Sequence, residues 1–106
     1  MPEWQSISRS DFERFLNEEL ASCHPEERAL FERTRTRIER RPLVDDRFLK
    51  TAFVVACYGG EVMYYNDIEG GFNTSPLTDE GSILEYWCNQ DNLQGALHTW
   101  LTQRRS

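Results

Sequence analysis

The sequence predicts an α+β domain: two N-terminal helices, an antiparallel β-meander of three or four strands, and a C-terminal helix packed on one sheet face. Three observations lead to this prediction. Apolar residues recur at helical spacing near the start of the chain and again near its end, and two runs rich in β-branched and aromatic residues flank a Gly-Gly pair in the middle. The chain has 106 residues and no repeat or linker, so we expect one domain over residues 1–106.

The first helix is predicted from the segment SRSDFERFLNEEL. Ser8 can cap this helix with Asp11 at the third position, and Ser10 with Glu13 is an equally good start. The apolar residues of the segment form one stripe that should pack against the core, and they are Phe12, Phe15, Leu16 and Leu20.

A second helix is predicted to begin near Pro25, because proline suits the first turn of a helix. We expect it to run to about Arg40 and to stop at Pro42. Its apolar side is thin, so it should be mostly solvated and supported by ion pairs at i,i+4 spacing, namely Arg28 with Glu32 and Arg35 with Glu39.

The centre of the predicted fold is a β-hairpin over residues 48–68 that turns at Gly59 and Gly60, since glycine tolerates the positive φ angles of a two-residue loop. This turn would place Tyr58 opposite Glu61 and, by strict alternation, Val55 opposite Tyr64. The face assigned to the core carries Phe53, Val55, Cys57, Val62, Tyr64 and Ile68. The face expected to stay partly open carries Ala52, Val54, Ala56, Tyr58, Glu61, Met63, Tyr65 and Asp67.

The rest of the chain predicts two more strands and the last helix. Residues 72–75 are expected to form a short edge strand because Pro76 follows them. Residues 82–88 (SILEYWC) are expected to form a further strand. The last helix should start around residues 89–91, end near Arg104 and Arg105, and lie on the sheet through its apolar face of Leu93, Ala96, Leu97, Trp100 and Leu101.

Negative charge is concentrated in the sheet half of the chain. The net charge is −6, and residues 51–103 contain no Lys or Arg but seven acidic residues, which are Glu61, Asp67, Glu69, Asp79, Glu80, Glu85 and Asp91. The pattern predicts an anionic surface and argues against a general polyanion binder or a protein of the membrane surface. The alternative is that these acids only keep the domain in solution.

The cysteines predict a reduced, cytoplasmic setting. Cys23, Cys57 and Cys88 form an odd set without CxxC spacing, and no apolar run is long enough for a signal peptide or a membrane span. Cys57 and Cys88 are expected to pack as small apolar side chains. A zinc site from Cys23, His24, Cys88 and His98 matches no paired-ligand spacing, so no metal, cofactor or catalytic residue is predicted.

A run of arginines offers a contact for phosphate groups, and it comprises Arg33, Arg35, Arg37, Arg40 and Arg41. Glu32 and Glu39 partly neutralise this run, and the whole chain is acidic. Nucleic-acid binding is therefore disfavoured.

The leading functional hypothesis is a small acidic protein-binding module, of the immunity or antitoxin kind, that inhibits a basic partner protein such as a nuclease. Two alternatives stay open: an uncharacterised enzyme or small-ligand-binding domain that uses the Tyr and Trp cluster with nearby carboxylates, and self-association into a homodimer. A pocket lined by Tyr65, Trp87 and acids would favour a small ligand. The residues expected to meet the partner are Tyr58, Glu61, Tyr65, Asp67, Glu69, Asp79, Glu80 and Trp87.

Overall fold

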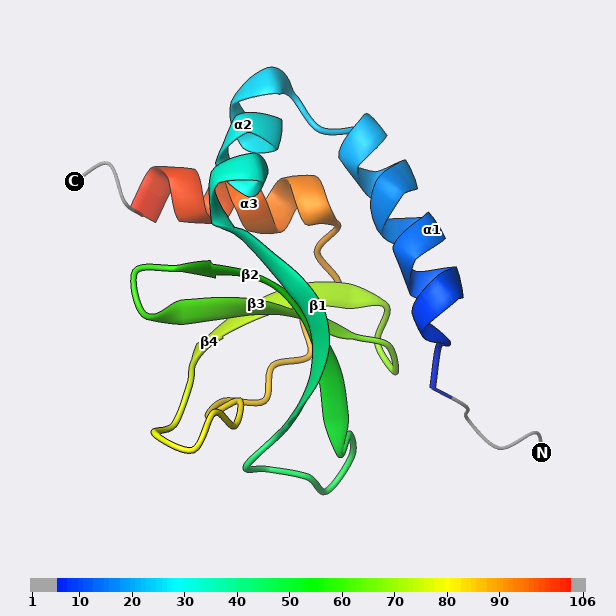
Figure 1. Cartoon of the computed structure of the whole chain (residues 1–106), viewed down its shortest axis with the longest axis vertical. Coiled ribbons are helices and arrows are strands. Elements are labelled where there is room, and N and C mark those ends of the chain that lie inside the picture. Colours follow the sequence, from blue (N-terminus) through cyan, green and yellow to red (C-terminus); the bar gives the residue numbers. More distant parts are fainter. Residues whose placement is uncertain (1–5, 104–106) are drawn as a thin grey trace.

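The computed structural model describes residues 6–103 and confirms the predicted α+β order (Figure 1). Four strands form one antiparallel sheet in the order β1-β2-β3-β4, with two helices before it and α3 packed on it. Arg104 and Arg105 lie outside the described residues. The elements are α1 (Arg9–Ala21), α2 (Pro25–Thr34), β1 (Arg35–Pro42), β2 (Thr51–Tyr58), β3 (Glu61–Asn66), β4 (Gly71–Pro76) and α3 (Leu93–Gln103).

Both N-terminal helices begin where their capping residues predict. The hydroxyl of Ser8 accepts a hydrogen bond from the backbone N–H of Asp11 at 3.2 Å, which selects Ser8 over Ser10 as the cap of α1. At the start of α2 the carboxylate of Glu27 accepts a hydrogen bond from the backbone N–H of His24 at 3.0 Å. None of the helices within residues 6–103 is both long and apolar enough to cross a lipid bilayer.

The prediction that the second helix continues to about Arg40 was wrong. Helix α2 ends at Thr34, and the next eight residues form β1, which pairs with β2. The expected i,i+4 pair of Arg35 and Glu39 does not form, and Arg35 instead contacts Glu32 at 3.1 Å. The physical reason lies in β2, whose residues are mostly buried and which needs a strand on each side, so tertiary pairing overrides the helical charge spacing.

The predicted strand at residues 82–88 was also wrong. Within it only Ile83 forms bridges, to Leu43 on one side and to Leu77 on the other. The backbone N–H of Ile83 donates to the carbonyl of Pro42 at 2.8 Å, so this residue links the end of β1 to the chain that follows β4. Residues 84–92 then run without regular secondary structure, and β1 takes the fourth place in the sheet.

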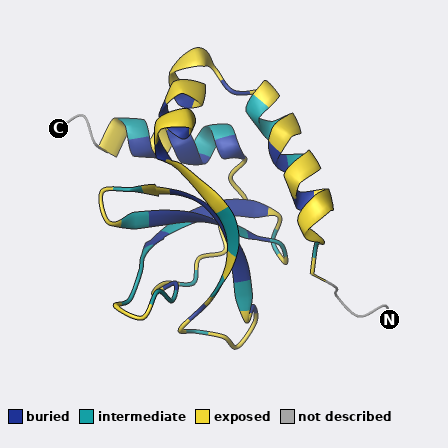
Figure 2. Ribbon diagram, in the orientation of Figure 1, coloured by how far each residue is buried: buried dark blue, intermediate teal, exposed yellow. Residues whose placement is uncertain are grey.

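Buried residues of β2, β3 and β4 belong to two separate cores, which corrects the expectation that one face of the sheet stays partly open, whereas β1 is mostly exposed (Figure 2). The ladder follows the predicted register near the turn, but it shifts between Val54 and Ala56, so Val54 rather than Val55 lies opposite Tyr64. The first core, shared with the three helices, includes Phe53, Val55, Ala56, Met63 and Phe72, and the second includes Leu43, Leu49, Ala52, Val54, Val62, Tyr64 and Ile83. Cys57 and Ile68, which were assigned to the core, are exposed.

Candidate binding cleft

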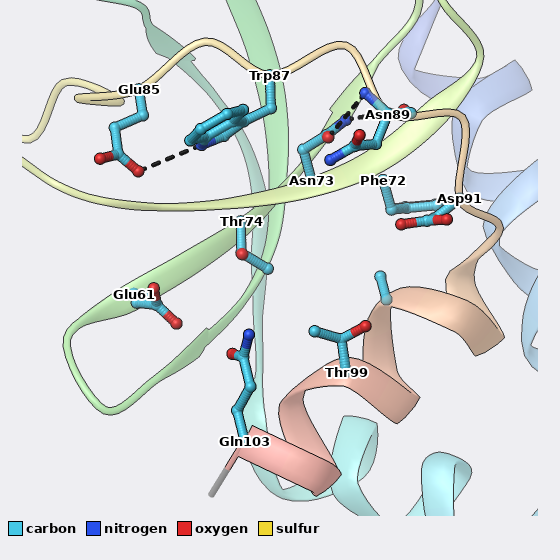
Figure 3. A pocket seen from close by; sticks show the side chains of 11 residues that line it. Glu61, Phe72, Asn73, Thr74, Glu85, Trp87, Asn89, Asp91, Thr99 and Gln103 are labelled. Carbon is cyan, nitrogen blue, oxygen red and sulfur yellow. Dashed lines mark hydrogen bonds between the residues drawn. The ribbon is translucent and has the colours of Figure 1, made fainter.

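A cleft of about 320 Å³ opens between β4, the irregular segment 85–91 and α3 (Figure 3). In Figure 3, Thr74 of β4 lies between the two walls, with Glu85 and Trp87 on one wall and Thr99 and Gln103 of α3 on the other. Among residues 6–103, none of those that line the cleft is Lys or Arg. They are Glu61, Phe72, Asn73, Thr74, Glu85, Trp87, Asn89, Asp91, Ala96, Thr99 and Gln103.

Three carboxylates from two parts of the chain line this cleft. Glu61 is the first residue of β3 and follows the Gly59–Gly60 turn, while Glu85 and Asp91 belong to the irregular segment. Carboxylates gathered in a concave site focus a negative potential on the space between them, which raises the local concentration of cations. The cleft is therefore suited to a positively charged group.

Trp87 supplies an aromatic surface in the same cleft, and this residue is 48% exposed. The indole Nε1–H donates a hydrogen bond to the carboxylate of Glu85 at 3.2 Å, which orients the ring. Tryptophan is the side chain that binds cations best through its ring face, and it is common among the anchor residues of protein interfaces.

Buried polar side chains hold the backbone on both sides of Trp87. The Tyr64 hydroxyl accepts from the N–H of Trp87 at 2.7 Å and donates to the carbonyl of Glu85 at 3.0 Å. The side-chain amide of Asn66 donates to the carbonyl of Trp87 at 3.0 Å. Burial raises the pKa of Tyr64 to about 12, although the hydrogen bond from Trp87 opposes this rise, so the hydroxyl remains a donor at neutral pH.

The other end of the segment is held against β4. Asn73 is 3% exposed and exchanges two hydrogen bonds of 3.2 Å with the backbone of Asn89. The N–H of Phe72 donates to the carbonyl of Asp91 at 2.8 Å. Gly71 allows this close approach, because a Cβ atom there would clash with the carbonyl oxygen of Asn89 and would lie 2.6 Å from Cα of Gln90. The segment is thus fixed although it has no regular secondary structure.

Of the predicted contact residues, the structure brings only Glu61 and Trp87 together in the cleft. The ring of Tyr58 packs on Trp100 of α3 at a centroid distance of 5.5 Å, and the ring of Tyr65 packs on Phe12 of α1 at 5.2 Å. Both tyrosines are half-buried under the helices, and burial raises the pKa of Tyr65, with Asp67 and Glu19 adding to the rise. Both rings were expected on a partly open face; they are partly exposed, but they pack against the helices and not in the cleft.

The remaining predicted acids lie outside the cleft. The carboxylate of Asp67 accepts a hydrogen bond from the backbone N–H of Ile7 at 2.8 Å, which ties the chain before α1 to the sheet. Glu69 accepts from the side chain of Gln90 at 3.4 Å. Asp79 and Glu80 are exposed in the turn after β4.

Sequence reasoning missed Glu85 and Asp91 as members of the site. Both belong to the acidic set of the sheet half, but the proximity of Glu61 and Glu85 depends on how the irregular segment folds back on β4. One signal was present in the sequence: Glu85 and Trp87 are two residues apart, so in an extended segment they lie on the same side.

The cysteines and histidines lie apart from this cleft. Cys23 is buried, and burial together with Glu27 and Glu19 raises the pKa of its thiol. Cys57 and Cys88 are exposed, which corrects the expectation that they pack as apolar side chains. His98 is exposed, and its Nδ1 lies 3.7 Å from a carboxylate oxygen of Glu27. Within residues 6–103, His, Cys, Asp and Glu side chains form no group of three or more that could hold a metal ion.

The cleft therefore combines negative charge, an oriented indole ring and several neutral hydrogen-bonding side chains on a fixed backbone. Such a site can hold a cationic group, and the described residues of the cleft carry no arrangement that defines a reaction. Comparison with known proteins finds no matching family model, no matching curated protein and no matching solved structure.

Proposed function

We propose that this protein is a small acidic protein-binding module that holds a basic partner protein at the cleft. The observation that supports this proposal is the cleft itself, where three carboxylates and the half-exposed Trp87 line one space and none of the described lining residues is basic. Opposite charge accelerates the encounter of two proteins, and a buried aromatic anchor slows their dissociation. Of the predicted contact residues, the proposed interface keeps Glu61 and Trp87 and leaves out the others.

The finer form of the proposal is an immunity- or antitoxin-like inhibitor of a cationic enzyme such as a nuclease. It is supported by the size of the chain, by its net charge of −6 and by the concentration of acids in residues 51–103. We include a cytoplasmic setting in the proposal because the three cysteines are free thiols.

A second candidate is the binding of a small cationic ligand in the same cleft. The cleft volume of about 320 Å³ is at the lower end of the range of about 300–1,000 Å³ for small-molecule pockets. Asn73, Asn89 and Gln103 add amide groups that could orient such a ligand. Tyr65, which a ligand pocket was expected to include, lies under α1 instead.

The test is capture of a partner from the native lysate, followed by binding measurements with the purified partner at low and high salt. We expect a basic partner whose affinity falls as salt rises, because the contact is between charged surfaces. Trp87→Ala should weaken binding by about thirtyfold, the effect of an interface anchor. Glu61→Gln with Asp91→Asn should also weaken it, while the matched control, Asp79→Asn with Glu80→Gln, should not.

Three results would contradict the proposal: a partner that is not basic, an affinity independent of salt, or equal losses in the cleft variant and in its control. Binding of a small cation alone, with the same sensitivity to Trp87→Ala and without any protein partner, would favour the second candidate.

A further inference from the structure

The molecule carries a basic surface at the sheet edge opposite its acidic cleft. Strands β1 and β4 are the two edges of the sheet, and the cleft borders β4. Five arginines lie on β1 and the end of α2, accompanied by only two acids within residues 32–41, Glu32 and Glu39. The arginines are Arg33, Arg35, Arg37, Arg40 and Arg41.

Three of these arginines are already engaged. Arg35 contacts Glu32 at 3.1 Å, and Arg41 contacts Glu39 at 3.1 Å. Arg40 donates to the carbonyl of Ile7 at 2.8 Å and lies over the ring of Phe53 at 4.1 Å. Two of these arginines are therefore neutralised by neighbouring carboxylates, and the third supports the fold.

Arg33 and Arg37 differ from them. Both are exposed, and no carboxylate within residues 6–103 forms an ion pair with either of them. The β1–β2 ladder passes from Arg35 opposite Ala56 to Glu39 opposite Val54, so β1 contains two extra residues there. Arg37 lies in this bulge, and bulges commonly redirect a side chain away from the ladder. Arg33 lies four residues earlier, in the last turn of α2.

We propose that the acidic cleft of one molecule receives Arg33 and Arg37 of a second copy, so that the protein associates head to tail. This inference rests on the proposed function, because it uses the same cleft as a receptor for basic side chains. The opposite charges of the two surfaces favour this occupant, and guanidinium groups suit both carboxylates and the ring face of Trp87. Pairing of like surfaces would place arginine against arginine or acid against acid, which is repulsive.

A head-to-tail contact has two consequences. Each molecule that uses its cleft still has a free arginine surface, so association continues beyond a dimer unless the rotation between copies closes a ring, and the average mass should rise with concentration. A basic partner that occupies the cleft should displace the second copy, so partner binding and self-association compete.

The test uses two complementary charge-reversed variants of the full chain in sedimentation velocity, from about 1 µM to about 1 mM protein. The cleft variant is Glu85→Lys with Asp91→Lys, and the edge variant is Arg33→Glu with Arg37→Glu. The matched controls apply the same charge changes elsewhere on the surface, as Asp79→Lys with Glu80→Lys and as Arg9→Glu with Arg14→Glu. Circular dichroism establishes that each variant is folded.

We expect the average mass of the wild type to rise with concentration, and each reversed variant to associate at least about tenfold more weakly. An equimolar mixture of the two variants should associate again, because the unchanged cleft of the edge variant receives the unchanged arginines of the cleft variant, and the two reversed surfaces also carry opposite charges. When the cleft variant is mixed with excess wild type, it should shorten the chains. Its arginines still bind a wild-type cleft, but its own reversed cleft cannot bind the arginines of the next molecule. The two controls should associate like the wild type.

The inference is overturned if the wild type stays monomeric over the whole range, or if the reversed variants associate as strongly as their controls. It is also overturned if the cleft variant does not shorten wild-type chains. The edge variant separates this result from the proposed function: it should lose self-association and keep its affinity for a basic partner. If the wild type is monomeric but still binds such a partner, only the inference of self-association fails. If the wild type associates with itself but binds no basic partner, only the proposed function fails.

Discussion

The hydroxyl oxygen of Tyr64 lies 2.7 Å from the backbone nitrogen of Trp87 and accepts a hydrogen bond from it. The same hydroxyl donates to the carbonyl of Glu85 at 3.0 Å, so one side chain fixes the residues on both sides of Tyr86. Tyr64 is fully buried in the second core, whereas the ring of Trp87 is half-exposed in the cleft. The position of the candidate anchor thus depends directly on the packing of β3.

Tyr64→Phe should destabilise the fold by about 1–3 kcal/mol, because it keeps the ring and leaves the N–H of Trp87 and the carbonyl of Glu85 without their partner. The measurement is urea unfolding at neutral pH. The matched control is Tyr86→Phe, whose half-buried ring packs at a tilt against exposed Phe48 with 5.6 Å between the ring centroids and which should change stability by no more than about 0.5 kcal/mol. Equal losses in the two variants would mean that the Tyr64 hydroxyl has no special role.

The contribution of Tyr64 should disappear at alkaline pH. Its pKa is raised from 10.0 to about 12 in the folded state, chiefly by burial. Folding therefore favours the protonated hydroxyl of Tyr64. Its contribution to the free energy of unfolding is complete below pH 10 and is lost as the pH rises through about 12. Because the pKa of Tyr65 is also raised, the informative quantity is the difference in unfolding free energy between the wild type and Tyr64→Phe. A difference that stays constant from pH 9 to pH 12 would contradict this assignment.

Gly71→Ala should displace segment 85–91 and destabilise the protein by about 2–4 kcal/mol, the range of severe steric and backbone effects. The added Cβ would lie 2.6 Å from Cα of Gln90, and backbone atoms cannot move away as a flexible side chain can. Gly70→Ala is the control: its Cβ meets open space, and the cost comes only from the φ angle of +78°, about 1–2 kcal/mol. Urea unfolding and partner affinity are the two measurements. A smaller loss for Gly71→Ala than for Gly70→Ala in both would contradict the proposed close contact.

Local signals were sufficient to predict much of the fold. The cap at Ser8, the apolar stripe of α1 and the Gly59–Gly60 turn each depend on a few neighbouring residues, and the structure confirms them. The end of α2 does not depend on neighbours alone. The arginine-rich residues after Thr34 fit a helix by their charge spacing, but β2 is buried on both sides and draws them into a strand. That requirement is visible only once the sheet is assembled.

The candidate site was predictable only in part, for a similar reason. Glu61 and Trp87 stand out in the sequence as an acid beside a glycine turn and as an aromatic residue in an acidic segment. Their approach to each other depends on side-chain hydrogen bonds from Tyr64 and Asn73, which leave no periodic pattern in the sequence. The one-residue shift at Val55 has no sequence signal either, yet it changes which side chains of β2 face the helices.

The three thiols should react at two distinct rates with an aromatic disulfide reagent. Cys57 and Cys88 are exposed, while Cys23 is buried and has a raised pKa, so less of its thiol is present as the reactive thiolate. Two thiols should react quickly at pH near 8, and the third should react at least about tenfold more slowly until denaturant is added. Cys57→Ser and Cys88→Ser should each remove one fast thiol, and Cys23→Ser should remove the slow one. Fast loss of all three thiols in the folded protein would show that the packing of Cys23 between α1 and α2 opens readily.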